Sequence, residues 1–282
     1  MNLPKKPALS ALLLALAALL CHAASPADID EEDPYFILSG QADQAAAEGD
    51  YEAAAARLLE AMAVRPDAPE NVMLLSNLGM IYSYLDRDSL AIATLTAALD
   101  RAPAMRTVLA NRAHVYLKIG RDPEARADLD RLVALDSLNA EGRYLRGLLA
   151  LAANEDSLAA ADFAVLESLS PEGLPTAIAR AALLTKQGLA ADALPYLRRM
   201  ASLAPRPEHF AALAETFLAL GRLSEAGETI SEGMEKFPDN AELYLCRAKL
   251  HRDLYELDRA RADARQAQRL GIPRDKIKAL GL

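Results

Sequence analysis

Small and apolar residues recur along this chain with the spacing of paired helices. A glycine or alanine is followed twelve positions later by an alanine at seven places: Ala42/Ala54, Gly79/Ala91, Ala113/Ala125, Gly147/Ala159, Ala181/Ala193, Ala214/Ala226 and Ala248/Ala260. The steps between the second members of neighbouring pairs are 37, 34, 34, 34, 33 and 34 residues. A period of about 34 residues is typical of helix-turn-helix repeats.

Larger apolar residues follow the same period and predict the buried face of each helix. One position of the second helix holds Leu58, Leu95, Leu129, Phe163, Leu197 and Ile230 in turn. Small residues at a helix crossing allow close approach, and larger neighbours then fill the space beside them. The turn between the two helices is expected to need left-handed backbone angles. Six repeats hold a tolerant residue there, namely Gly49, Asp86, Gly120, Asn154, Gly188 and Gly221, and Tyr255 is the exception.

The second repeat carries the clearest family signature. Leu75, Asn77, Leu78, Gly79 and Tyr82 precede Ala91, Leu95, Ala98 and Pro103 in this repeat. This combination resembles the tetratricopeptide repeat (TPR) family, and repeats begin in phase at residues 35, 72, 106, 140, 174, 207 and 241. The resemblance implies an all-α fold: a right-handed α-solenoid of about seven helix-turn-helix repeats over residues 35–274. Residues 275–282 are predicted to form a short C-terminal cap, because the last repeat of a solenoid needs one.

The resemblance also implies where a partner would bind. In this family the first helix of each repeat lines a concave groove, which can hold an extended peptide. Carrying over the groove-facing positions gives these candidates: Asn77, Met80, Asn111, His114, Tyr144, Leu148, Leu151, Ile178, Lys249 and Arg252. Ser76 and Ser83 fall at the same kind of position. For the apolar candidates, a place in the core between repeats is an equally good interpretation, and the two asparagines could instead bond the backbone of neighbouring repeats.

A charge pair recurs inside the repeats. Arginine at the seventh position is matched by aspartate at the twenty-third in three repeats, giving the pairs Arg112/Asp128, Arg146/Asp162 and Arg247/Asp263. We expect an ion pair that joins the two helices of one repeat. The fourth such arginine, Arg180, faces Tyr196 instead. A row of anion-binding arginines is the alternative interpretation.

The first residues have the features of an export signal. Lys5 and Lys6 precede an apolar run over residues 11–20, which is too short to cross a bilayer as a helix. Cleavage after Ala23 fits best, giving a signal peptide over 1–23 and an acidic linker over 24–34. The chain is then expected to be periplasmic or secreted. The alternative is an outer-membrane lipoprotein anchored through Cys21, although Leu20 is bulky for such a site.

Composition narrows the class of function. The formal net charge of −9 argues against a nucleic-acid partner, and no apolar segment beyond the signal is long enough to span a membrane. The four histidines are scattered without metal-ligand spacing, and phosphate-binding or nucleophile motifs are lacking, so the sequence predicts no cofactor, no metal site and no enzyme. Removal of Cys21 would leave Cys246 as a lone thiol, most simply a buried one.

Two functions follow from these features. The first is a non-catalytic scaffold or adaptor of the bacterial cell envelope, which holds a peptide or protein of unknown identity in the concave groove. The second is a lipid-anchored or structural assembly factor of an envelope complex, which binds through its outer faces.

Overall fold

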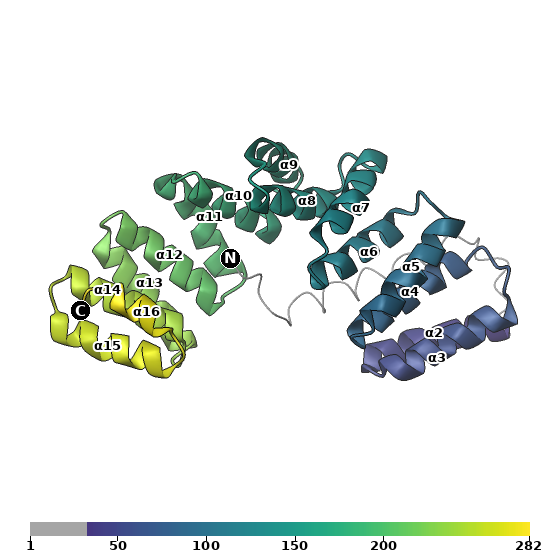
Figure 1. Ribbon diagram of the computed structural model, residues 1–282, viewed down its shortest axis with the longest axis horizontal. Coiled ribbons are helices and arrows are strands. Elements are labelled where there is room, and N and C mark those ends of the chain that lie inside the picture. Colours follow the sequence, from purple (N-terminus) through teal and green to yellow (C-terminus); the bar gives the residue numbers. More distant parts are fainter. Residues whose placement is uncertain (1–32) are drawn as a thin grey trace. The chain divides into compact units, whose positions relative to one another are not determined.

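The computed structural model describes residues 33–282, and this part of the chain is helical with no strand. Seven helix pairs follow one another and a short helix, α16, closes the chain (Figure 1). The pairs are α2 (Pro34–Glu48) and α3 (Tyr51–Val64), α4 (Asn71–Tyr84) and α5 (Asp88–Arg101), α6 (Arg106–Lys118) and α7 (Asp122–Leu135), α8 (Ala140–Ala152) and α9 (Asp156–Leu169), α10 (Leu174–Lys186) and α11 (Ala190–Leu203), α12 (Pro207–Ala219) and α13 (Leu223–Lys236), and α14 (Ala241–Asp253) and α15 (Leu257–Arg269). The predicted all-α class and the seven helix-turn-helix repeats are confirmed. The expected signal peptide, its cleavage after Ala23 and the lipid site Cys21 lie outside the described residues.

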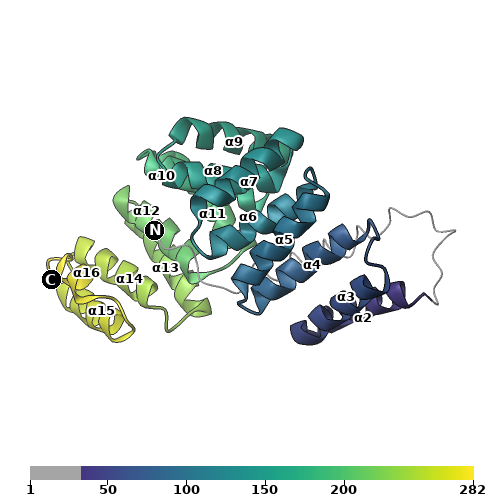
Figure 2. The same cartoon turned by 45° about the vertical axis from the view of Figure 1, so that its right-hand side comes forward.

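The chain divides into two compact units between Ser137 and Leu138. Unit 1 contains helices α2 to α7, and unit 2 contains α8 to α16 (Figure 2). Within each unit the first helix of a repeat packs on its own second helix, and α4, α6, α10, α12 and α14 also pack on the second helix of the preceding repeat. First helices of neighbouring repeats also touch, as α4 with α6, α8 with α10 and α12 with α14.

The small residues of the repeat lie where helices cross. Gly79 and Gly147 are both buried. A Cβ atom on Gly79 would lie only 2.5 Å from the Cγ atom of Leu95, and one on Gly147 would collide with the ring of Phe163. Leu95 and Phe163 are fully buried side chains of the facing second helices. The alternation of small and large residues is therefore a packing requirement inside each repeat.

All seven turns inside the repeats adopt the left-handed backbone that the spacing predicted. Asp86, Asn154 and Tyr255 have φ values of 56°, 63° and 60°, close to those of Gly120 and Gly221. Tyr255 thus departs from the pattern in residue type but not in conformation. Because a Cβ atom is strained in this conformation, the chain tolerates a cost at Tyr255 that the glycines avoid.

Both ends of the described chain are capped by local interactions. The Asp33 side chain accepts a hydrogen bond from the Tyr35 amide (2.8 Å), and Pro34 opens α2. At the other end, α16 (Arg274–Lys278) brings Ile277 and Leu280 against a cluster that includes Leu245. Leu280 is buried, so this segment covers apolar surface of the last repeat.

The three predicted ion pairs are present, and each is bidentate. Nε and Nη2 of Arg112 donate to the two carboxylate oxygens of Asp128 at 2.7 Å each. The same two bonds measure 2.8 and 2.7 Å for both Arg146 with Asp162 and Arg247 with Asp263. Since the guanidinium groups are already occupied, these arginines form internal links between helices rather than an anion-binding row.

The fourth arginine makes a different set of contacts. Its guanidinium lies over the Tyr196 ring, 5.7 Å from the ring centroid, as the sequence comparison of repeats suggested. Nε of Arg180 is also 3.4 Å from a carboxylate oxygen of Glu167. A cation–π contact and a neighbouring carboxylate thus take the place of the missing aspartate.

Candidate functional site

In unit 1, four of the candidate residues occupy equivalent positions of two neighbouring repeats. Asn77 and Met80 lie on α4, and Asn111 and His114 lie at the same two positions of α6. The two helices are in contact, and all four side chains are partly exposed. These four residues therefore lie on two contacting first helices of unit 1 and remain accessible.

The two asparagines of this face differ in their bonding. The Nδ2 group of Asn111 donates to the Oγ atom of Ser76 at 3.0 Å, which links α6 to α4. The Asn77 amide has no side-chain hydrogen bond to any residue in the range 33–282. Ser76 and Ser83, also expected at the groove, are buried instead. The amide of Asn77 is consequently available, as both donor and acceptor, to a bound molecule.

In unit 2, the apolar candidates are partly buried and pack against the core, so they do not only line a groove. Tyr144 and Leu148 are partly buried and pack against the cluster of Phe163 and its neighbours, and Ile178 packs against the adjoining core of the following repeats. Burial raises the pKa of the Tyr144 hydroxyl above its ordinary value. These three side chains expose one edge while the rest supports the packing between repeats.

Leu151, one of the expected groove residues, lies in the core instead. Its side chain is only 6% exposed and belongs to the core cluster with Leu183. The Lys186 ammonium covers the end of the same helix by donating to the Leu151 carbonyl at 2.7 Å and to Asp156 at 2.6 Å. The core interpretation, one of the two that the sequence left open, is the one that applies to Leu151.

The charged candidates near the end of unit 2 are paired. Lys249 of α14 forms an ion pair with Glu215 of α12, and Nε of Arg252 donates to Asp253 at 2.9 Å. Both cationic side chains remain partly exposed. An anionic ligand at this place would have to compete with the chain's own carboxylates.

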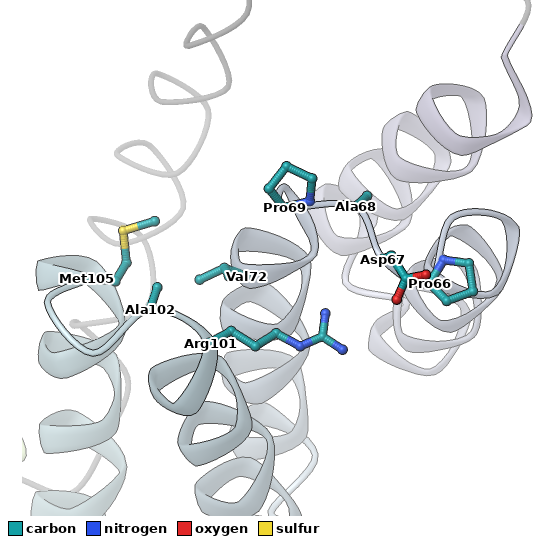
Figure 3. Close-up of a pocket in the computed structure, with 8 residues that line it drawn as sticks. All are labelled: Pro66, Asp67, Ala68, Pro69, Val72, Arg101, Ala102 and Met105. Carbon is teal, nitrogen blue, oxygen red and sulfur yellow. The ribbon is translucent and has the colours of Figure 1, made fainter.

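A cleft in unit 1 was not predicted. It has a volume of about 540 Å³ and lies between the loops that follow α3 and α5. Its lining consists of Pro66, Asp67, Ala68, Pro69, Val72, Arg101, Ala102 and Met105. Figure 3 shows Arg101 extending from the end of α5 toward the loop that carries Asp67. The only signal in the sequence is the proline-rich loop itself, which marks a turn but not a cavity.

The described residues offer little reactive chemistry. Between residues 33 and 282, no three histidine, cysteine, aspartate or glutamate side chains gather as metal ligands would. Cys246 is fully buried, and burial, together with the nearby Glu215 carboxylate, raises the pKa of its thiol to about 12. In the same part of the chain, no helix is both long enough and apolar enough to cross a membrane.

Comparison with known proteins agrees with the geometry. Profiles of the tetratricopeptide repeat family match residues 74–105 and residues 184–250. A crystal structure of a tetratricopeptide repeat protein from Parabacteroides merdae matches with a TM-score of 0.66 and 26% identity, over 88% of this chain and 97% of that one. The chain therefore contains tetratricopeptide repeats, in agreement with its helix pairs. Repeats of this family form scaffolds for protein interaction, and TPR proteins bind protein or peptide partners.

Two further solved structures share the fold of this TPR protein. PilW, a type IV pilus biogenesis factor, matches with a TM-score of 0.65 and 21% identity, over 74% of this chain and 96% of PilW. PilF from Pseudomonas aeruginosa matches with a TM-score of 0.65 and 18% identity, over the same shares of the two chains. At these identities the likeness concerns the fold alone. No curated protein matches this TPR protein in sequence.

Proposed function

We propose that this TPR protein is a non-catalytic scaffold of the bacterial cell envelope that holds an extended segment of a partner protein on the first helices of its repeats. The observation that carries the proposal is the pair of equivalent asparagines, Asn77 and Asn111, on the contacting helices α4 and α6. A carboxamide offers both a donor and an acceptor, and these are the groups that an extended peptide backbone needs. Within residues 33–282, the Asn77 side chain makes no hydrogen bond that would compete.

The residues beside the asparagines suit the same role. Met80 and His114 are partly exposed next to them, and a methionine side chain adapts to irregular apolar surfaces. In unit 2, the exposed edges of Tyr144, Leu148 and Ile178 offer apolar contact on α8 and α10. A partner with alternating apolar side chains and an accessible backbone would use both kinds of contact.

A site-specific crosslink tests the binding face. A photoreactive amino acid in place of Met80 is expected to capture a partner in the living cell, and the same amino acid at Ala97, exposed on the second helix α5, serves as the matched control. Adding Asn77→Ala should reduce the Met80 adduct by about tenfold without lowering the melting temperature, since the Asn77 side chain makes no hydrogen bond to the part of the chain that the structure describes. An equally strong adduct from Ala97, or one unchanged by Asn77→Ala, would contradict this face as the binding site.

The envelope location is supported by the sequence of residues 1–23 and is tested separately. We expect mass spectrometry of the protein from an envelope fraction to find a chain that begins at Ala24. A diacylglycerol group on Cys21 would favour the lipid-anchored assembly factor instead. An unprocessed chain in the cytoplasmic fraction would overturn the envelope assignment and leave the binding face untouched.

A further inference from the structure

The last repeat carries an unusual basic surface on its second helix. Arg261, Arg265 and Arg269 follow one another at intervals of four residues on α15, so they share one face of the helix. Arg265 and Arg269 have no ion pair or side-chain hydrogen bond within residues 33–282, and together with Gln268 they line a cleft of about 460 Å³. Arg261 has only a long contact of 3.7 Å to the fully exposed Asp258.

This lack of partners is not general among the exposed arginines. Arg57, Arg121 and Arg222 each pair with a glutamate three residues later on the same helix or turn. Like charges four residues apart on a helix destabilise it, and no carboxylate within residues 33–282 pairs with Arg265 or Arg269 to offset that repulsion. The repulsion is relieved if a negatively charged surface binds to α15.

The preceding repeat has a surface of opposite sign on its own second helix. Glu228, Glu232 and Glu235 lie exposed on α13, the second helix of the sixth repeat. Glu228 and Glu235 have no side-chain partner in the described part of the chain, whereas Glu232 pairs with Lys236 at 2.7 Å. Both α13 and α15 pack on α14, so the two stripes belong to one packed assembly within unit 2.

The two stripes match each other in length. At 1.5 Å per residue, Glu228 and Glu235 are separated by about 10 Å along α13, and Arg261 and Arg269 by about 12 Å along α15. A surface that contains two complementary halves is complementary to a second copy of itself after a two-fold rotation. Helix α13 of one copy would then face α15 of the other, and the reverse contact would form at the same time.

We propose that the outer face of α13 and α15 is a dimerisation surface for a second copy of this chain. This inference goes beyond the proposed function, since it uses the second helices and leaves the asparagine face free. A membrane or a nucleic acid fits less well, because an extended anionic surface that reaches α15 would also meet the three glutamates of α13. Because exposed ion pairs are individually weak and screened by salt, the dimer is expected to be weak and salt-sensitive.

Charge exchange between the two stripes gives a sharp test. We would measure association of the purified protein by sedimentation velocity at about 50 mM and about 500 mM salt. The wild-type protein should dimerise at low salt and dissociate at high salt. The variants Arg265→Glu/Arg269→Glu and Glu228→Lys/Glu235→Lys should each raise the dimer dissociation constant by about tenfold or more, since like charges then face each other.

An equimolar mixture of the two variants should restore the dimer at low salt, because the substituted positions of unlike variants again place opposite charges against each other. Arg57→Glu/Arg101→Glu in unit 1 changes the net charge as much as the arginine variant does and should leave the dimer intact. A wild-type protein that stays monomeric at low salt would overturn the proposal. A mixture that fails to restore association, or arginine-dependent binding to phosphatidylglycerol vesicles in place of dimerisation, would also overturn it.

Discussion

Removing one partner of a buried ion pair should destabilise this protein far more than removing a surface pair. Asp128 is 4% exposed and Arg112 is 14% exposed, and their bidentate bond is completed by a third bond of 2.9 Å from Arg112 to Thr96. The hydrogen bonds to Asp128 raise the pKa of Arg112 above its ordinary value, so the guanidinium stays charged. Asp128→Ala therefore leaves a largely buried cation without its countercharge. Breaking a fully buried pair costs about 3–5 kcal/mol, and we expect about 2–3 kcal/mol here because Arg112 retains some contact with water.

A double-mutant cycle isolates the interaction. In an Arg112→Ala background, the cost of Asp128→Ala should fall below about 1 kcal/mol, which gives a coupling free energy of about 1.5–2 kcal/mol. Urea unfolding followed by circular dichroism measures each free energy from the midpoint and the slope. Glu60→Ala serves as the surface control, since its pair with Arg57 is about half exposed and should contribute less than about 0.5 kcal/mol.

The loss of stability on removing the aspartate should also differ among the three pairs. Asp162 is fully buried and binds both Arg143 and Arg146, so Asp162→Ala should cost the most. Asp263 is 10% exposed and its partner Arg247 is 36% exposed, so Asp263→Ala should cost the least. A coupling free energy near zero for Arg112 with Asp128, or a reversed order among the three aspartates, would refute the assignment of these pairs as links between the helices.

Three further changes test the packing, the turns and the buried thiol. Gly147→Ala should destabilise the protein by about 1–3 kcal/mol because its methyl group meets Phe163, whereas Gly40→Ala, with open space around it, should stabilise the helix by about 0.5–1 kcal/mol in the same urea assay. Tyr255→Gly should raise the free energy of unfolding by up to about 1 kcal/mol, since the side chain is 90% exposed and the backbone is left-handed. A loss of stability would mean that the Tyr255 ring makes a stabilising contact. The Cys246 thiol, with its pKa raised to about 12, should resist alkylation at pH 8 until the protein unfolds. The free energy of unfolding should fall as pH rises above about 9, because only the thiol of the unfolded chain ionises there. Rapid alkylation of the folded protein would contradict the burial of Cys246.

The repeated copies made much of the fold predictable. Comparing one repeat with another supplied what a single copy could not, because a packing constraint returns at each step of the period. Gly79 with Leu95 and Gly147 with Phe163 are two instances of one steric rule. The pairing of Arg112 with Asp128 was visible for the same reason, since repeats that lack the arginine also lack the aspartate.

The depth of a side chain was not predictable in the same way. Position within the repeat fixes the direction of a side chain, but its exposure depends on the size of the residues that the next repeat places against it. Leu151 points from a first helix as expected and is nevertheless covered in the cluster that includes Leu183. Similarly, the second arginine on Asp162, Arg143, comes from a position that carries no such partner in the other repeats.

The residues that every repeat shares are those that maintain the helix pair, so the differences between repeats indicate where function lies. Small residues at the crossing and left-handed turns recur throughout, and they are explained by packing alone. The paired asparagines occur only in the second and third repeats, and the opposed charge stripes of α13 and α15 only in the last two. Neither feature is required by the fold, and each includes polar side chains that have no side-chain partner among residues 33–282. We therefore expect the proposed binding through α4 and α6 to be separable from the proposed self-association through α13 and α15, and a variant defective in one should keep the other.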